Sequence, residues 1–355
     1  MKTIRIGGAS GYWGESDMAV PQLLETRGLN VIVFDYLAEI TMSILARARL
    51  KDPAKGYATD FVGDAMQPHL SEIARQGVKI ISNAGGVNPQ ACAEAVRALL
   101  QRQGLDLSVA VVLGDDIADR AEELAAEDRT DMFSGAIFPD PASLASINAY
   151  LGAFPIAAAL AQGADIVITG RCVDSAVTLG ACIHAFGWAR DDYDRLAAGS
   201  LAGHILECGP QATGGNHTDW ESVADSLTDV GYPIVEIAED GSFGVTKPAG
   251  SGGAVTVGTV GEQMLYEIGD PQAYMLPDVV CDFSGVTLQQ VGDDRVRVAG
   301  ATGRPAPDTY KVSATYMDGF RCATSVMLGG RDAAAKARRT GEAIFERTRR
   351  MFRER

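Results

Sequence analysis

The sequence lacks the features that mark several common classes of protein. Its six cysteines form no C-x-x-C pair, and its four histidines show no H-x-x-x-H or comparable spacing of metal ligands. We find no secretory signal and no apolar run that approaches the length needed to span a bilayer. A disulfide-rich secreted protein, a dedicated transition-metal site and a membrane-embedded protein are therefore disfavoured. We expect a cytoplasmic protein with reduced thiols.

Positive charge is also in short supply. The 31 Lys and Arg residues face 46 Asp and Glu residues, so the formal net charge is -15. Nucleic acids and anionic membranes carry the same sign of charge, which opposes binding to either and makes a small-molecule partner the expectation. At 355 residues, with 46% hydrophobic residues, the chain is long enough for one large or two medium domains.

Short β-rich runs alternate with helical patterns through the first half of the chain. This alternation predicts an α/β fold, with a parallel sheet flanked by helices in Rossmann-like layers, over residues 1–215. The runs are Ile4 to Ile6, Val31 to Phe34, Val78 to Ile81, Val109 to Leu113 and Ile166 to Ile168.

From residue 216 onward, short strands separated by turn signals replace this pattern. One of these predicted strands runs from Ala254 to Val260. Residues 216–355 are therefore predicted to form a β-rich α+β domain that ends in a basic amphipathic helix, Asp332 to Arg353.

Glycine is the residue in excess, and many of the 40 glycines lie where predicted strands end. Ligands of open parallel sheets bind beside the carboxyl ends of the strands, so we expect the loops after the first and third strands to line one binding cleft. The alternative is a set of tight strand-to-helix turns. The first loop fits neither the dinucleotide-binding nor the P-loop fingerprint. The predicted binding residues in the two loops are Gly7, Gly8, Ser10, Gly11, Asn83, Gly85, Gly86 and Asn88.

Charged side chains follow three other predicted strands. Arg171 suits bidentate recognition of a carboxylate or phosphate, and Asp174, Asp35 and Asp115 are candidate proton-transfer residues. A structural Arg171–Asp174 ion pair is the alternative for that loop, and a solvated helix N-terminus is the alternative for Asp115. Asp35 also stands where a ribose-binding acid would stand in a dinucleotide site.

Two further candidates lie later in the chain. Glu207, three residues after His204, falls at the junction of the two predicted domains, where ligands often bind, although a packed or capping pair is the alternative. Lys247 stands beside a glycine cluster that could receive an anionic group, or it is a solvated lysine of a mobile hairpin. We predict no set of metal ligands, while a carboxylate-bound magnesium stays open.

Several short segments, in this order and spacing, resemble the AtuA-like acyclic terpene utilisation family from about Ile4 to about Arg338. The resemblance implies catabolism of acyclic isoprenoids or related branched acids, with coenzyme A thioesters as intermediates, and it does not imply a reaction. Many relatives carry a small additional C-terminal module, so a separate partner subunit is a further expectation. The segments are Arg5 to Gly11, Asp35 to Glu39, Ser82 to Gly86, Asn148 to Gly152, Thr169 to Arg171, Glu207 to Gly209 and Lys247-Pro248.

Three functional hypotheses follow. The first is an enzyme that acts on an acyl-CoA or related carboxylate as a lyase, hydratase or hydrolase without a redox cofactor, coenzyme A entering only as part of the substrate. The second is a nucleotide-dependent oxidoreductase or transferase on a Rossmann-like sheet. The third is a non-catalytic ligand-binding subunit of a carboxylase-type complex. In each case we expect a homo-oligomer.

Overall fold

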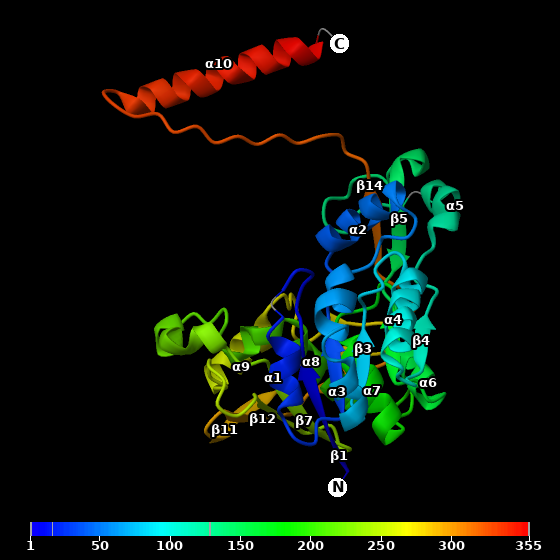
Figure 1. Ribbon diagram of the computed structural model, residues 1–355. Coiled ribbons are helices and arrows are strands. Elements are labelled where there is room, and N and C mark those ends of the chain that lie inside the picture. Colours follow the sequence, from blue (N-terminus) through cyan, green and yellow to red (C-terminus); the bar gives the residue numbers. More distant parts are fainter. Residues whose placement is uncertain (1, 16, 128, 354–355) are drawn as a thin grey trace. The chain divides into compact units, whose positions relative to one another are not determined.

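The computed structural model describes residues 2–15, 17–127 and 129–353 (Figure 1). Two compact units divide the chain, residues 1–316 and residues 317–355. The larger unit holds every strand of the described chain, together with the helices up to α9.

A nine-stranded sheet is the centre of the larger unit. Its strand order is β11-β12-β8-β7-β1-β2-β3-β6-β4, and the five strands from β1 to β4 in this order are mutually parallel. These parallel strands coincide with the five predicted runs, so the α/β prediction is confirmed. They are β1 (Thr3–Gly8), β2 (Val31–Phe34), β3 (Lys79–Ser82), β6 (Ile166–Thr169) and β4 (Val109–Val112).

Helices cover both faces of the parallel strands because successive side chains of a strand point to opposite faces, and here both sets are apolar. Ile32 and Ile80 pack with the helices of one face, whereas Val33 and Val167 pack with those of the other. The first face holds α1 (Ala19–Leu24), α2 (Glu39–Lys51), α3 (Leu70–Gln76) and α4 (Pro89–Gln103). The second holds α6 (Phe154–Ala161), α7 (Ala176–Phe186) and α8 (Tyr193–Glu207).

Strands after residue 216 extend the same sheet. β7 pairs antiparallel with β1, through partners such as Ile6 and Val235, and the remaining antiparallel strands follow outward. A division of the chain into separately folding parts near residue 216 stays a prediction. These strands are β7 (Ile234–Ala238), β8 (Phe243–Thr246), β12 (Arg295–Ala299) and β11 (Thr287–Gly292).

The prediction of a strand from Ala254 to Val260 is wrong, because α9 (Val257–Leu265) begins inside it. The Thr256 side chain accepts from the Thr259 amide, and the Thr259 hydroxyl accepts from the Thr256 amide, which is a capping box that starts a helix. Two small sheets complete the larger unit. One joins β13 (Thr302–Arg304), β10 (Val280–Asp282) and β9 (Tyr274–Met275), and the other joins β5 (Leu144–Ala149) to β14 (Val312–Tyr316).

Residues 317–355 carry the predicted C-terminal helix, α10 (Ala333–Arg353). Its apolar side chains recur at helical spacing and are exposed, as at Ile344, Phe345, Met351 and Phe352. Basic residues occupy the opposite side. Within the described residues, no helix combines the length and the apolar character needed to cross a membrane.

Candidate functional site

The ends of the first three parallel strands are joined by hydrogen bonds. Asn83 Nδ2 donates to Asp35 Oδ1 at 2.5 Å, and the Ser10 hydroxyl donates to the Asp35 carbonyl at 2.8 Å. The Tyr36 amide donates to Asn83 Oδ1 at 2.8 Å. The structure therefore brings together three predicted site residues, Ser10, Asp35 and Asn83, because parallel strands end at one edge of the sheet.

Asp35 is a buried carboxyl group in acidic surroundings. Burial, with the nearby charges of Asp174 and Glu207, raises its pKa well above the ordinary value, and Arg171 and Asn83 offset this only in part. Burial thus favours the neutral, protonated form of Asp35.

Arg171 follows β6 and is 2% exposed. Its Nη1 lies 2.6 Å from Asp174 Oδ1, and its guanidinium lies 4.1 Å from the centre of the Tyr150 ring, a cation–π contact. Within the described chain, Arg171 Nε is buried without a hydrogen-bond partner. The alternative of an Arg171–Asp174 ion pair is present, and the Nε donor of the guanidinium is left over.

Asp115 fixes the backbone of the same loop. Its Oδ2 accepts from the Arg171 amide at 2.7 Å and from Asn148 Nδ2 at 2.9 Å. A Cβ at Gly170 would collide with this carboxylate, so glycine is required at that position. These contacts make Asp115 a positioning residue for Arg171, while the predicted proton-transfer role stays a prediction.

Glu207, the last residue of α8, pairs with His204. Glu207 Oε1 lies 2.6 Å from His204 Nδ1, and both residues are buried. Burial raises the pKa of Glu207 to about 7, although His204 opposes the shift. Burial by itself lowers the pKa of His204, but the charge and hydrogen bond of Glu207 raise it overall. Both shifts favour the protonated forms of the two side chains.

We call Asp35, Arg171, Asp174, His204 and Glu207 the strand-end cluster. Its members are within electrostatic reach of one another, since Asp174 and Glu207 both raise the pKa of Asp35, and Asp174 also acts on His204 and Glu207. Three carboxyl groups thus face one guanidinium and one imidazole in a largely buried setting. Such a cluster retains exchangeable protons at neutral pH, which is the requirement for acid–base chemistry.

The glycines of the first loop are explained by close packing against the end of α8. A Cβ at Gly8 would lie 2.6 Å from the Leu206 carbonyl oxygen, and one at Gly11 would lie 2.7 Å from the Cys208 Cα. The Gly8 amide donates to the Pro233 carbonyl, and the Gly11 amide donates to Glu15. The binding role predicted for Gly7, Gly8 and Gly11 therefore stays a prediction, and these two amides already have protein acceptors.

The second glycine loop and the distant lysine have structural partners of their own. Asn88 caps α4 by accepting from the Ala91 amide, Gly86 has a left-handed φ of 53°, and a Cβ at Gly85 would lie 2.6 Å from the Pro89 Cβ. Lys247 lies 2.6 Å from the Ser251 carbonyl oxygen and 3.1 Å from Asp294 Oδ2. Neither contact of Lys247 involves the strand-end cluster, so its binding role stays a prediction.

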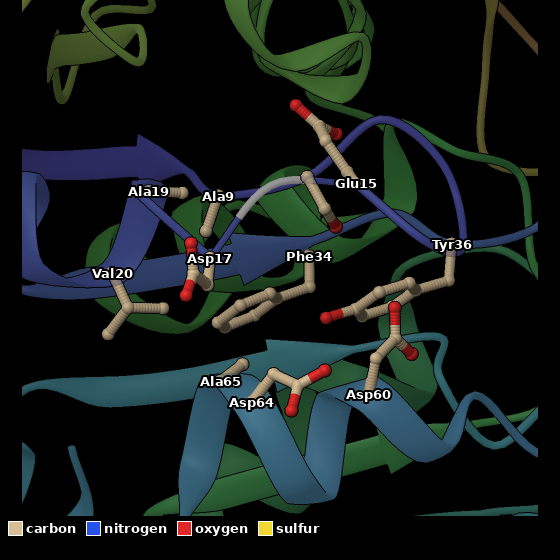
Figure 2. A pocket seen from close by; sticks show the side chains of 11 residues that line it. Ala9, Glu15, Asp17, Ala19, Val20, Phe34, Tyr36, Asp60, Asp64 and Ala65 are labelled. Atoms are coloured by element: carbon tan, nitrogen blue, oxygen red, sulfur yellow. The ribbon is translucent and has the colours of Figure 1, made fainter. Parts of the chain in front are cut away.

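A small acidic hollow lies beside the first loop, over the π-helix η1 (Phe61–Met66) (Figure 2). Figure 2 shows Glu15 and Asp17 on one side and Asp60 and Asp64 on the other, with the rings of Phe34 and Tyr36 between them. Its volume of about 20 Å³ is room for one water molecule. Among the described residues, no group of three or more His, Cys, Asp or Glu side chains is arranged to hold a metal ion.

His204 was not among the predicted site residues, and Tyr150 and Asn148 were named only as family motif residues. The signal for His204 was its three-residue spacing from Glu207 on a helix, which places both on one face. The signal for Tyr150 and Asn148 was their place in one short motif before Gly152, whose contact with Arg171 and Asp115 joins segments far apart in the sequence.

Comparison with known proteins identifies a family. The model of a family described as "Acyclic terpene utilisation family protein AtuA" matches residues 4–354, nearly the whole chain. Neither a curated protein nor a solved structure matches the chain.

Proposed function

The chain belongs to the acyclic terpene utilisation family AtuA, and from this premise we propose that it is an enzyme acting on a carboxylate of acyclic isoprenoid breakdown, or on its coenzyme A thioester. The reaction class is that of a lyase, hydratase or hydrolase, driven by proton transfer without a redox cofactor. Coenzyme A enters only as part of the substrate.

The strand-end cluster is the observation that carries this proposal. Burial of ionisable groups costs free energy unless each is paired, and here three carboxyl groups compete for one arginine and one histidine. Perturbed groups of this kind gather where chemistry requires them. The cluster also lies at the carboxyl edge of the parallel strands, which is where ligands of such sheets bind.

The roles follow from the partners of each group. Arg171 fixes the anionic end of the substrate, because its Nε is a free donor and its planar guanidinium favours two-point contact with a carboxylate. Asp35 acts as the acid, because burial holds its proton. Asp174, which is part-exposed and paired with Arg171, acts as the base.

The nucleotide-dependent alternative has less support. The amides of Gly8 and Gly11, which would approach a pyrophosphate, donate to protein acceptors.

The C-terminal helix supports a role for a protein partner. α10 carries seven Lys and Arg residues and two Glu residues, whereas the whole chain has a net charge of -15. Its exposed apolar side, with Phe345 and Phe352, offers a surface for protein contact, and its basic side complements an acidic protein. The occupant is a second copy of this acidic chain, as in a homo-oligomer. A small partner subunit, as in the scaffold alternative, is the other outcome to be tested.

Thermal-shift measurements test the proposed function, since a ligand of the native state raises the melting temperature. We expect geranic acid, an acyclic terpenoid acid, or its coenzyme A thioester to raise it, and NAD, NADP and ATP to leave it unchanged. A shift with the nucleotides alone would overturn the proposal. Magnesium is added in a parallel series, to learn whether a carboxylate-bound ion contributes.

A further inference from the structure

His204 has one ring nitrogen engaged and the other without a partner. Nδ1 lies 2.6 Å from Glu207 Oε1, whereas Nε2 has no hydrogen-bond partner in the described part of the chain. The residue is only 1% exposed. A buried polar atom that lacks a partner lowers stability, so native proteins retain one mainly where a ligand or ordered water meets it.

The packing around His204 fixes the ring beside the cluster. Gln263 Nε2 donates to the His204 carbonyl at 2.9 Å, which holds the end of α8. A Cβ at Gly203 would lie 2.8 Å from the Cα of Ser175, so this glycine lets the residue after Asp174 pack directly against α8. The ring of Tyr274, from β9, lies with its centre 5.9 Å from that of His204.

Acidic groups surround the ring on several elements. Besides Glu207 on α8 itself, Asp174 from the loop after β6 and Glu267 from the segment after α9 favour the charged form of His204. Glu267 also holds a left-handed φ of 60°, a conformation that disfavours residues with a Cβ. These charges raise the pKa of His204 although burial opposes the shift, which favours the doubly protonated ring, the form in which Nε2 is a hydrogen-bond donor.

We propose that His204 is a proton-transfer residue of the strand-end cluster, in which Glu207 holds Nδ1 and Nε2 contacts the substrate. This inference rests on the proposed function. In the forward step the Nε2–H bond breaks and an O–H bond forms at a developing oxyanion of the substrate. The ring becomes neutral and keeps its proton on Nδ1, which donates a hydrogen bond to Glu207. The imidazole regains a proton at Nε2 from solvent when product leaves, and Asp174, the proposed base, releases to solvent the proton that it took as the oxyanion developed.

A purely structural ion pair is the competing explanation, and the chain offers a matched control for it. His217 Nδ1 lies 2.9 Å from Glu262 Oε2, with the Glu262 side chain 39% exposed. The groups that act on the Glu262 carboxylate are His217 and Thr218, and neither belongs to the strand-end cluster. His217→Asn therefore removes the imidazole of a similar pair outside the strand-end cluster.

Two substitutions separate the two nitrogens of His204. In His204→Asn the amide Nδ2 takes the place of Nδ1 and the bond to Glu207 survives, but nothing replaces Nε2. In His204→Gln the amide takes the place of Nε2 and the bond to Glu207 is lost. A structural pair would therefore tolerate Asn better, whereas a ligand contact would tolerate Gln better.

The experiment measures the binding of geranic acid and of its coenzyme A thioester, by calorimetry for the affinity and by nitrogen NMR for the histidine rings. We expect His204→Asn to weaken binding of the better probe by at least about tenfold at a near-unchanged melting temperature, since hydrogen bonds to charged groups are of this size. His204→Gln should bind more tightly than His204→Asn, and His217→Asn should bind like the wild type. In the wild type, saturation with the probe should shift the Nε2 resonance of His204 and leave that of His217 in place.

The possible failures are distinguishable. One outcome is that the probe binds and Arg171→Lys weakens its binding, while the probe leaves the His204 Nε2 resonance of the wild type in place and His204→Asn binds it as tightly as the wild type. In that case the inference about His204 is wrong and the proposed function stands. If neither probe binds to the wild type, both are wrong. If His204→Asn fails to fold, the wild-type Nε2 resonance alone decides the inference.

Discussion

Gly8→Ala tests whether the first glycine loop exists for packing or for a ligand. Gly8 ends the central strand β1, and an added Cβ would lie 2.6 Å from the Leu206 carbonyl oxygen of α8. Ordinary contact begins near 3.4 Å, so strand and helix must separate by roughly 0.8 Å. Both elements lie in the core, where overpacking costs about 1 to 3 kcal/mol, and we expect about 3 kcal/mol here.

Urea denaturation of the variant, followed by far-ultraviolet circular dichroism, measures this loss. Gly7→Ala is the matched control, because the three atoms nearest to its added Cβ belong to the Leu23 side chain, the closest at 2.7 Å, and a side chain yields more easily than backbone. We expect it to lose about 1 kcal/mol. A Gly8→Ala variant with the same urea midpoint of unfolding as the wild type would refute the packing explanation. A variant that kept its stability but lost affinity for geranic acid would restore the loop as a ligand cradle.

Three further predictions follow. Asp115→Ala leaves the Arg171 backbone amide and the Asn148 side-chain amide without their acceptor, so the free energy of unfolding should fall by about 3 kcal/mol in urea denaturation. Asp116→Ala, at the neighbouring exposed position, should change it by less than about 0.5 kcal/mol. Equal effects of the two substitutions would contradict the positioning role. The folded-state pKa of Glu207, about 7, exceeds its unfolded value of 4.5, so the stability that its protonated form contributes is present below pH 4.5 and is lost as the pH rises through 7. The free energy of unfolding of Glu207→Gln, relative to that of the wild type, should therefore rise from pH 5 to pH 8 by an amount on the order of a few kcal/mol. A difference that did not change with pH would contradict the shift. A chain that ends at Tyr316 should show a smaller assembly than the full chain in light scattering, because α10 is removed; an unchanged assembly would exclude the helix from the interface.

The parallel half of the fold follows from the sequence because buried parallel strands are short, continuous apolar runs, as at Val31 to Phe34. The antiparallel extension was not predicted, because the pairing of β1 with β7 joins residues more than 200 positions apart and leaves no local signal. The segment 254–260 was misjudged because its alternating apolar residues outweighed the Thr256 cap. Propensity and pattern act locally, whereas sheet order depends on distant partners.

The candidate site shows the same division. Asp35, Arg171 and Asp174 were predicted because the carboxyl ends of parallel strands must meet at one edge. The reason for Gly8 was not visible, because the atom it accommodates belongs to Leu206. No pattern revealed that Lys247 has Asp294 as its partner, since a short loop can present a lysine either to solvent or to a distant carboxylate.

Isothermal titration calorimetry of geranic acid and its coenzyme A thioester tests the central claim most directly, with the wild type and Arg171→Lys compared at one pH. Lysine keeps the positive charge but loses the planar, two-point contact with a carboxylate. The account predicts that the wild type binds at least one of the two probes, and that Arg171→Lys binds it at least about tenfold more weakly at an equal melting temperature. Equal affinity in the two proteins, or a loss of affinity that only follows a loss of stability, would contradict it.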